Sequence, residues 1–522
     1  VLRSLDNHRE SQAAEITHLN FRLGSKATLA EISFSGGEKV LLEPNDIVVF
    51  VGPNNSGKSK TLTEIAESLS IDETNLDERF RSQLVVKSMK LAKNGTSEDL
   101  WEFLVRNGSA RGDSVRFQNH ETTKSRVKAF DQRMLGNVAP YFCLKLDAQS
   151  RLGVVQTQNG VGPGGIAAHP QHFLYDNEQL MSQLSREFRS AFDLDLFFDF
   201  RGAPQIPIHV GETPPVEDGE DRISDSYVQK VRKFPEISNQ GDGMKSYAGI
   251  LFQTIVFPRQ MTFIDEPEAF LHPPQMRRLG RTLSDNSPGQ LFIATHSSDI
   301  LRGFLEADSQ RVRVIRLRRK GSKHHATELA PEKVTELWRH PQIRYSTALD
   351  SIFHEQAINC EDDSDCRLYS AVFHFLENQG EKSKWPDTHF VPAGGKHAMP
   401  RIARALSELD VPLKMAFDID VLNNESTLKS VVESVGGRWG QFEELWTQLN
   451  LEVRSGVKPK TNQQIADEIR SLLKDVSQGL PKSEIESALK DDKAWSIVKK
   501  KRSCSHTERR CNNALQQIDR NA

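Results

Sequence analysis

Apolar residues occur along the chain in short runs and alternating patterns, and these patterns predict its strands and helices. The first fifty residues alternate apolar and polar positions and end in the continuous apolar run DIVVFV at 46–51, which suits a fully buried strand. A helical spacing of apolar residues follows at 58–70. Further apolar runs predict strands at 250–265, 290–295, 357–361 and 414–418, before a largely helical tail.

The distribution of these patterns predicts an α/β protein with two domains. A polar, basic stretch at 318–345 is typical of a domain junction. We therefore expect one domain over 1–345 and a second over 346–522. Within the first, residues from about 80 to 235 form a long segment of mixed α/β character with a Gly/Pro-rich loop, which we interpret as an insert.

Size and composition are those of a soluble globular protein with two or three domains. The chain has 522 residues, of which 37% are hydrophobic and 27% charged. No apolar run reaches the roughly 18–20 residues that span a bilayer, and the N-terminal VLRSLDNHRESQAAE has no apolar core for a secretion signal. The five cysteines are scattered without metal-ligand spacing. Reduced thiols, a cytoplasmic location and no membrane association are expected.

The net charge of −3 means that any nucleic-acid surface must be local. The run RVRVIRLRRKGSKHH at 311–325 is a candidate for such a surface. An alternative is a strand with one buried face, because alternating arginine and apolar residues also describe that structure.

A glycine-rich segment between the first buried strand and the first helix has the pattern of a phosphate-binding loop. GPNNSGKS at 52–59 is Gly, four residues, then Gly-Lys-Ser, in the strand–loop–helix context that this loop requires. Lys58 is expected to reach the β- and γ-phosphates of ATP, and the Ser59 hydroxyl to bind Mg²⁺. The expected contacts to ATP are Gly52, Pro53, Asn54, Asn55, Ser56, Gly57, Lys58, Ser59 and Lys60. The alternative is a glycine-rich turn that matches by chance.

Two later strand ends carry the other residues that ATP hydrolysis needs. MTFIDEPEAFLHP at 261–273 ends its apolar run in Asp265 and Glu266. Asp265 is expected to hold Mg²⁺ through water, and Glu266 to orient or deprotonate the attacking water. LFIATHSSDI at 291–300 ends in His296, a candidate contact to the γ-phosphate. Each element alone is weak, but their order along the chain is specific.

The segment SNQGDGMKSYAG at 238–249 places Gly241, Asp242 and Gly243 just ahead of a helix, in a second anion-binding arrangement. It resembles the signature loop of ABC-type ATPases, and the order of all the motifs is similar to that family over about 15–315. The resemblance implies that the signature loop contacts ATP bound by a partner subunit, and hence at least a dimer. Gln149 is the candidate Mg²⁺-sensing glutamine, or else an ordinary surface residue.

Two clusters of acidic residues follow strands in the C-terminal half. AINCEDDSDCRLYSAV at 357–372 carries four acids, and LKMAFDIDVLNN at 413–424 carries Asp418 and Asp420. Side chains two apart on a strand share a face, so both carboxylates can point at one ion. Oxygen ligands without His or Cys suit Mg²⁺ or Mn²⁺. The alternative is that the acids cap helices in solvated turns.

Together these clusters resemble the Toprim domain, whose pattern falls here on Glu361, Asp365, Asp418 and Asp420. The segment HFVPAGGKHAM at 389–399 resembles the strand and Gly-Gly-Lys turn of the OLD (overcoming lysogenization defect) family of ATPase–Toprim nucleases. This second resemblance covers nearly the full chain. The OLD family usually has Gly after the first Glu, whereas this chain has Asp362, which adds charge and bulk beside the predicted metal site.

The resemblance implies metal-dependent hydrolysis of phosphodiester bonds. Glu361 would be a general base or metal ligand, with Asp365, Asp418 and Asp420 holding one or two ions. Lys396 and one of Lys499–Lys501 are candidates to stabilise charge on phosphate. We expect an ATP-regulated DNA endonuclease in anti-phage defence or DNA repair, active as a homodimer or higher oligomer. OLD-like proteins occur alone, beside helicases, or beside retron reverse transcriptases, and these are candidate partners.

Two other hypotheses stay open. The C-terminal domain can be a degenerate Toprim scaffold in an ATP-switched module that binds DNA or a partner. A pure ATP-driven clamp of the repair type is less favoured, because such clamps insert long coiled coils and 80–235 has no heptads.

The tail after Lys499–Lys501 departs from the OLD family, which continues with a Gly, an apolar strand and a Pro-x-Gly turn. Residues 502–513 read RSCSHTERRCNN. A permissible set of codons for them, read with the first base dropped, encodes GLAVIPNGDAT, which has those three features. We therefore interpret 502–513 as a candidate frame-shifted segment.

Overall fold

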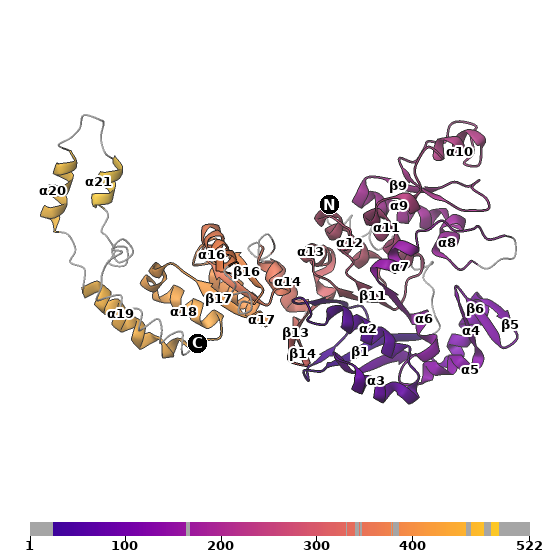
Figure 1. The fold of residues 1–522 in the computed structure, drawn as a ribbon, viewed down its shortest axis with the longest axis horizontal. Coiled ribbons are helices and arrows are strands. Elements are labelled where there is room, and N and C mark those ends of the chain that lie inside the picture. The colour runs from indigo at the N-terminus through magenta and orange to yellow at the C-terminus, as the bar shows by residue number, and fades with distance from the viewer. Residues whose placement is uncertain are drawn as a thin grey trace, which may run out of the picture. The chain divides into compact units, whose positions relative to one another are not determined.

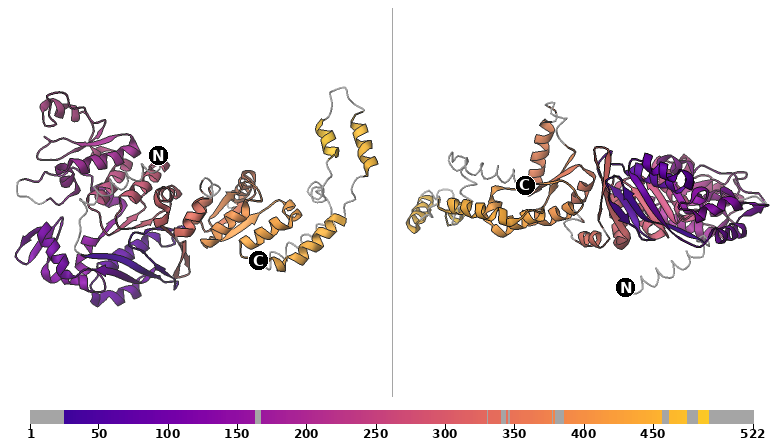
Figure 2. Two further views of the ribbon diagram at one scale, coloured as in Figure 1. Left: turned by 180° about the vertical axis from the view of Figure 1, so that it is seen from behind. Right: turned by 90° about the horizontal axis from the view of Figure 1, so that it is seen from below.

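Two compact units make up the chain (Figures 1 and 2). The first comprises Val1–Arg344 with Ile352–His354, and the second Tyr345–Ser351 with Glu355–Ala522. The computed structural model describes residues 25–162, 167–329, 331–339, 344, 347–376, 378, 386–455, 461–473 and 482–489. Lys499–Lys501, the segment 502–513, Cys504 and Cys511 lie outside the described residues.

A six-stranded sheet is the centre of the first unit, in the order β14-β13-β3-β12-β11-β8. Its strands are β3 (Ile47–Val51), β8 (Cys143–Leu146), β11 (Met261–Asp265), β12 (Gln290–Ala294), β13 (Val312–Lys320) and β14 (Lys323–Leu329). All neighbours pair in parallel except β13 and β14, which form an antiparallel hairpin. The predicted strands at 46–51 and 290–295 are confirmed, and every residue of β3 is buried.

One face of this sheet is covered by helix α2 (Lys58–Leu69) and by a smaller antiparallel sheet. That sheet has the order β2-β1-β4, with β1 (Lys26–Phe34), β2 (Lys39–Leu41) and β4 (Val86–Asn94). Alternate residues of the central strands face this layer, because side chains of a strand alternate between its two faces. Phe263 of β11 and Phe292 of β12 stack there with ring centroids 4.8 Å apart. One apolar core therefore joins both sheets and α2.

Helices cover the other side of the central sheet. Figure 1 draws α9 (Glu178–Phe192), α11 and α12 on the side of β11 away from α2 and α3 (Leu76–Ser82). They include α11 (Asp242–Leu251), α12 (Pro273–Asn286) and α13 (Ser298–Asp308). The predicted strand at 250–265 is wrong in its first part, because α11 continues into a π-helix over Phe252–Val256 and only Met261–Asp265 is a strand. A short apolar run fits the period of a strand and of a buried helix equally well.

The expected insert at 80–235 is not one continuous block. Its strands β4 and β8 belong to the two sheets above, so the chain leaves those sheets twice, over 95–142 and after 146. The first excursion holds α4 (Ser97–Asn107), β5 (Ser109–Arg111), β6 (Ser114–Phe117), β7 (His120–Thr123), α5 (Lys124–Val127) and α6 (Ala139–Phe142). The second holds α7 (Ala148–Gly153), α8 (Pro170–Asp176), α9 (Glu178–Phe192), β9 (Asp195–Phe198), β10 (Ile208–Gly211) and α10 (Asp225–Val231).

The basic run at 311–325 forms the β13–β14 hairpin, and most of its charge is engaged within the first unit. Arg313 pairs with Asp46 at 2.5 Å and Glu328 at 2.7 Å. Arg316 is 1% exposed and donates to the carbonyls of Ile352 and His354. These contacts agree with the alternative interpretation, a strand with one buried face. The exposed charge of the hairpin lies at its tip, on Arg319, Lys320 and Lys323.

A parallel sheet is the centre of the second unit, in the order β16-β15-β17. Its strands are β15 (Gln356–Cys360), β16 (Thr388–Pro392) and β17 (Leu413–Ala416). Helix α14 (Pro331–Arg339) still belongs to the first unit. The helices of the second unit are α16 (Asp363–Leu376), α17 (Met399–Glu408), α18 (Glu425–Ser434), α19 (Glu443–Ser455), α20 (Asn462–Leu472) and α21 (Lys482–Leu489). The tail is helical as predicted, over the part of it that is described.

Among the described residues, no helix combines the length and apolar character needed to cross a bilayer. Cys143, Cys360 and Cys366 are free thiols.

The contact between α7 and α11 generates a prediction about stability. A Cβ on Gly249 of α11 would lie 2.1 Å from the carbonyl oxygen of Arg151 in α7. Gly249→Ala must push the two helices apart, and such overpacking costs about 1–3 kcal/mol. We expect a lower thermal unfolding midpoint by differential scanning fluorimetry. Gly153→Ala is the matched control, because a Cβ there meets no atom within 4 Å; equal midpoints for the two variants would contradict the prediction.

Candidate functional sites

The predicted nucleotide-binding residues lie at one edge of the central sheet. Because β3, β8, β11 and β12 are parallel, their carboxyl ends meet at the same edge. The glycine-rich loop 52–57 follows β3, Glu266 follows β11, and Thr295 and His296 follow β12. Gln149 lies exposed in the first turn of α7, after β8. The fold brings the four segments together from positions far apart in the sequence.

The glycine-rich loop has backbone angles that require glycine at two of its positions. Gly52 has φ 136° and Gly57 has φ 102°, values that residues with a Cβ rarely adopt. A Cβ on Gly52 would also lie 2.3 Å from the carbonyl oxygen of Leu317 in β13. Asn54 and Asn55 are exposed at the tip of the loop. Helix α2 begins directly afterwards at Lys58, so its free N–H groups face the loop.

Lys58 is buried at this edge with its ammonium group directed at the loop. It donates to the carbonyl oxygens of Gly52 at 2.8 Å and Pro53 at 3.0 Å. Burial lowers the pKa of Lys58 to about 8, although the nearby carboxylates of Glu268 and Glu266 act in the opposite direction. Lys60, two residues further along α2, is exposed and lies 4.0 Å from Glu64.

Ser59 and Asp265 form the part of the edge that fits Mg²⁺. Burial raises the pKa of Asp265, and a hydrogen bond from the Ser59 side chain opposes that shift. Within the described part of the chain, Asp265 Oδ1 and Ser56 Oγ are buried and have no hydrogen-bond partner. Hydroxyl and carboxylate oxygens are the ligands that Mg²⁺ prefers. The unsatisfied Asp265 oxygen is therefore an available acceptor for such an ion.

Glu266 has an unusual backbone conformation and a side chain that is 51% exposed. Its φ is 46°, in the left-handed region, which costs about 1–3 kcal/mol and persists only where neighbours hold it. Its N–H donates to the carbonyl of Ala294 in β12 at 2.8 Å. His296 Nε2 lies 3.9 Å from Glu266 Oε1. Burial and the charge of Lys58 lower the pKa of His296, which favours its neutral form.

The signature loop, residues 241–243, lies at the start of α11. Gly241 and Asp242 are exposed, and Asp242 pairs with Lys245 at 2.8 Å. A Cβ on Gly243 would lie 2.6 Å from the carbonyl oxygen of Phe270, so glycine permits the close approach of α11 to the turn after β11. The first N–H groups of a helix have no acceptor within that helix, so the exposed start of α11 offers backbone hydrogen-bond donors.

The predicted acidic site of the second unit also lies at the carboxyl ends of parallel strands. Cys360 of β15 is level with Pro392 of β16 and Ala416 of β17. Glu361 therefore follows the central strand, between the turn at 393–396 and the turn that begins at 417. The N–H of Gly395 donates to the carbonyl of Glu361 at 2.8 Å. Lys396, the next residue, is half-buried.

Asp362 and Asp365 form hydrogen bonds with backbone N–H groups at the start of α16. The Asp362 carboxylate accepts from the N–H of Ser364 at 2.8 Å and of Asp365 at 3.2 Å. The Asp365 carboxylate in turn accepts a hydrogen bond from the N–H of Asp362 at 3.3 Å. A hydrogen bond from the Ser364 hydroxyl is the main cause that lowers the pKa of Asp362. The alternative capping role is thus present in the structure, and the Asp362 side chain is held against the helix start.

Asp418 and Asp420 do not lie on a strand, which corrects the expectation that they share a strand face. β17 ends at Ala416, and Asp418 precedes a 3-10 helix over Ile419–Asn423. Asp418 is exposed, and the side chain of Asp420 lies outside the described residues. Among the side chains that are described, no three His, Cys, Asp or Glu residues gather as a metal site. Glu361 Oε2 is buried without a hydrogen-bond partner within the same part of the chain.

Comparison with known proteins finds one family model that matches part of the first unit. Residues 167–302 match a family model described as "AAA domain, putative AbiEii toxin, Type IV TA system". This unit carries an ATPase-type P-loop domain. The match includes α11, β11 and β12, whose ends were described above. No curated protein matches the chain.

Solved structures similar to the ATPase domain include two heads of SMC proteins and one ABC transporter subunit. A head bound to the C-winged helix domain of ScpA has 14% identity and a TM-score of 0.36, over 59% of this chain and 99% of that one. The SMC head domain from Thermotoga maritima has 10% identity and a TM-score of 0.30, over 58% and 98%. CbiO1 from Clostridium perfringens has 13% identity and a TM-score of 0.28, over 59% and 90%.

Two residues at the edge of the ATPase domain escaped the sequence analysis. Glu268 accepts from the N–H of His296 at 2.6 Å and from the Thr295 side chain, and burial raises its pKa. Arg151 is fully buried and donates to the carbonyls of Asp265 and Glu266. The third acid of MTFIDEPEAFLHP, two residues after Glu266, was a signal for Glu268. Nothing in the local sequence distinguishes Arg151 from a surface arginine.

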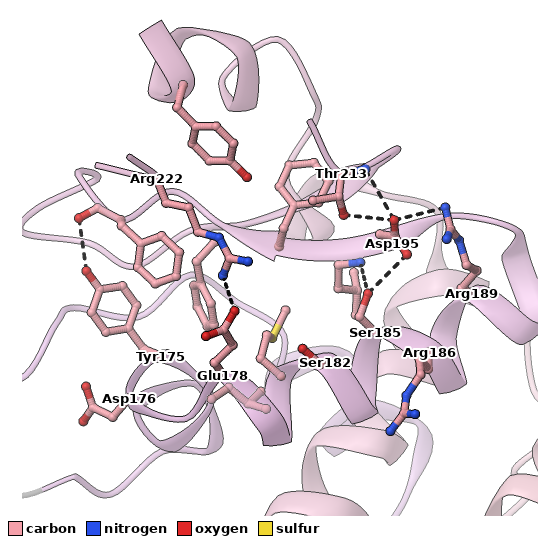
Figure 3. Close-up of a pocket in the computed structure, with 17 residues that line it drawn as sticks. Tyr175, Asp176, Glu178, Ser182, Ser185, Arg186, Arg189, Asp195, Thr213 and Arg222 are labelled. Atoms are coloured by element: carbon pink, nitrogen blue, oxygen red, sulfur yellow. Dashed lines mark hydrogen bonds and ion pairs between the residues drawn. The ribbon is translucent and has the colours of Figure 1, made fainter. Parts of the chain in front are cut away.

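A separate cavity of about 450 Å³ lies in the second excursion of the ATPase domain, among α8, α9, β9 and α10. Figure 3 shows two pairs of its charged groups directed at one another: Arg222 pairs with Glu178 at 2.7 Å, and Arg189 with Asp195 at 3.2 Å. Thr213 also donates to Asp195, at 2.9 Å. Four of the charged side chains that line the cavity are thus paired with one another, and the cavity is distinct from the P-loop edge.

The pKa of Lys58 generates a prediction about ATP affinity. With a pKa of about 8, its ammonium group is charged below pH 8 and loses its proton above it. Because phosphate binding favours the charged form, the affinity for ATP should be constant near pH 7. It should then fall by up to about tenfold per pH unit above pH 8. Isothermal titration calorimetry between pH 7 and 9.5 measures this.

Lys58→Ala is the control for that titration. It should bind ATP more weakly, with an affinity that does not change over the same pH range. A wild-type affinity that stays constant to pH 9.5 would show that the charge of Lys58 does not contribute to binding.

Proposed function

We propose that the chain is an ATP-regulated, divalent-metal-dependent DNA endonuclease. The observation that carries the ATPase half is the meeting of Lys58, Asp265, Glu266 and His296 at one sheet edge, from three parallel strand ends. Lys58 binds the β- and γ-phosphates, while Ser59 and Asp265 hold Mg²⁺, which supplies charge neutralisation at the phosphates. Glu266 orients and deprotonates the attacking water, and His296 contacts the γ-phosphate.

The active ATPase is proposed to be a homodimer. The resemblance to ABC-type ATPases assigns the signature loop to ATP held by a second subunit, and Gly241 and Asp242 are exposed as this role requires. The helix start behind them offers N–H groups and the positive end of a dipole to a phosphate. Each composite site would then use the P-loop of one subunit and the signature loop of its partner.

The nuclease half rests on the second unit and on its resemblance to Toprim domains. Glu361 follows the central strand of a parallel sheet, and its buried Oε2 has no partner among the described residues. We assign Glu361, Asp365, Asp418 and Asp420 as the residues that would hold one or two Mg²⁺ or Mn²⁺ ions, and such an ion would supply activation of water for phosphodiester hydrolysis. Lys396 is assigned to charge on the phosphate. From the resemblance to the OLD family we infer a role in anti-phage defence.

A second candidate function is an ATP-switched module that binds DNA or a protein partner. Two observations favour it: Asp362 and Asp365 cap α16, and the described side chains form no three-residue metal group. In this function the second unit would be a scaffold without catalysis.

The first test concerns ATP hydrolysis. Glu266→Gln removes the carboxylate that activates water but keeps the P-loop, so ATP affinity should stay within about threefold while turnover falls by about 10²–10⁴-fold. Steady-state phosphate release and nucleotide titration measure the two quantities. Glu102→Gln, on the exposed face of α4, is the matched control and should change neither. Normal turnover by a strictly monomeric wild-type protein would contradict the composite site.

The second test concerns DNA cleavage. Asp418→Ala and Asp420→Ala should each abolish plasmid nicking in Mg²⁺ or Mn²⁺ and leave ATP hydrolysis within about twofold, because the sites lie in separate units. Asp363→Ala is the matched control, since Asp363 is exposed and pairs with Arg367. Unchanged nicking in both variants removes the Toprim assignment. A wild-type protein that cuts under no metal or nucleotide condition supports the second candidate function.

A further inference from the structure

Arg151 is a buried charge that the proposed ATPase mechanism does not use. It lies in α7, two residues after Gln149, and it is 0% exposed. Taking a guanidinium out of water is costly unless its donors are satisfied. Its side chain makes three hydrogen bonds, to the Ser246 hydroxyl at 3.1 Å and to the carbonyls of Asp265 at 2.7 Å and Glu266 at 3.0 Å. An arginine buried in this way is fixed in one position.

Two of these bonds hold the backbone of the residue proposed to activate water. Glu266 has φ 46°, and its N–H is bonded to Ala294 of β12 while its carbonyl accepts from Arg151. The peptide groups on both sides of Glu266 are therefore fixed by neighbouring elements. The direction of the exposed Glu266 carboxylate is therefore set by the groups that hold its backbone, which do not contact ATP in the proposed site.

The third bond leads to the signature helix. Ser246 is buried in α11, the helix that begins at the signature loop. Gly249, one turn later, packs directly on Arg151, since a Cβ there would lie 2.1 Å from the Arg151 carbonyl. A movement of α11 must therefore carry Arg151 with it. At the start of the same helix, Gly243 approaches the carbonyl of Phe270, in the turn that follows Glu266.

We propose that Arg151 is a positioning residue that sets the direction of Glu266 and links it to the signature helix α11. The inference rests on the proposed ATPase dimer, because the signature loop there contacts the partner's ATP while Glu266 acts on the ATP of its own subunit. Arg151 then joins the two nucleotide sites: ATP at one site orders α11, and α11 positions Glu266 for the other. Such coupling is reciprocal and is measurable as cooperativity.

The test compares two variants with a matched control. Arg151→Lys keeps the charge but cannot make three bonds in the planar geometry of a guanidinium. Ser246→Ala removes the bond to α11 alone. The control is Arg259→Lys, another buried arginine, which donates to the carbonyls of Pro140 and Phe257 rather than to Glu266.

We expect Arg151→Lys to lower kcat for ATP by about 100-fold, as for a misplaced catalytic group, with ATP affinity within about threefold of wild type. Hydrogen–deuterium exchange over residues 264–271 should increase in this variant. Ser246→Ala should retain kcat and reduce the Hill coefficient for ATP to about 1. Arg259→Lys should change neither the exchange at 264–271 nor the Hill coefficient.

Three outcomes overturn the inference: kcat of Arg151→Lys within threefold of wild type, exchange at 264–271 that does not change, or equal effects of Arg151→Lys and Arg259→Lys. If Arg151→Lys does not fold, an unchanged Hill coefficient in Ser246→Ala overturns the link to α11. Failure of the proposed function gives a different result. A wild type that hydrolyses no ATP removes the ATPase dimer, whereas the exchange measurement still decides whether Arg151 holds the Glu266 backbone.

Discussion

The parallel alignment of β3, β8, β11 and β12 is the constraint on which the site depends. Parallel strands cannot be joined by tight hairpins, so each connection must cross back over the sheet, usually through a helix. The crossing segments leave the loops that follow the strands free at one edge. Residues as distant in sequence as Lys58 and His296 thus become neighbours without any direct link between their segments. The second unit repeats this geometry on a smaller scale with β15, β16 and β17.

This arrangement brings several ionisable side chains together at a buried sheet edge, where charged groups are poorly hydrated. Burial lowers the pKa of Lys58 and raises those of Asp265 and Glu268, so each group resists its charged form. Mutual attraction between the lysine and the carboxylates partly offsets that cost. Arg151 supplies a fixed positive charge behind the strand end, bonded to carbonyl oxygens rather than to the carboxylates. Over the described residues, Asp265 Oδ1 has no hydrogen-bond partner and the Glu266 side chain is exposed, so these two groups remain available for a metal ion and for water.

Much of the ATPase domain could be predicted because the candidate residues Lys58, Glu266 and His296 each follow a strand that the local sequence indicates. DIVVFV and LFIATH carry a continuous apolar run and then a polar residue, and both features are local. The connections of Arg151 could not be predicted, because its partners are the carbonyls of residues more than a hundred positions away. Strand β8 was missed because four residues with one lysine carry little pattern.

The acidic residues of the second unit show a different limit of sequence reasoning. An Asp at a helix start and an Asp in a metal site have the same neighbours in sequence, so Asp362 and Asp365 fit both roles. The spacing of Asp418 and Asp420 suggested a strand face, but β17 ends at Ala416 before either residue. Where a strand ends depends on its pairing with β15, and that pairing is a property of the whole unit rather than of the segment.

The position of β3 in the central sheet has a consequence for how the chain folds as it is made. β3 pairs with β12 and β13, and about 240 residues separate Val51 from the first residue of β12. At the usual rate of synthesis, about 5–20 residues per second, β3 waits for roughly 10–50 s before either neighbour emerges from the ribosome. During that time a fully apolar strand has two unpaired edges, a state that favours aggregation. The order in which the strands are encoded therefore leaves β3 exposed to aggregation for longer than a strand whose neighbours follow it directly.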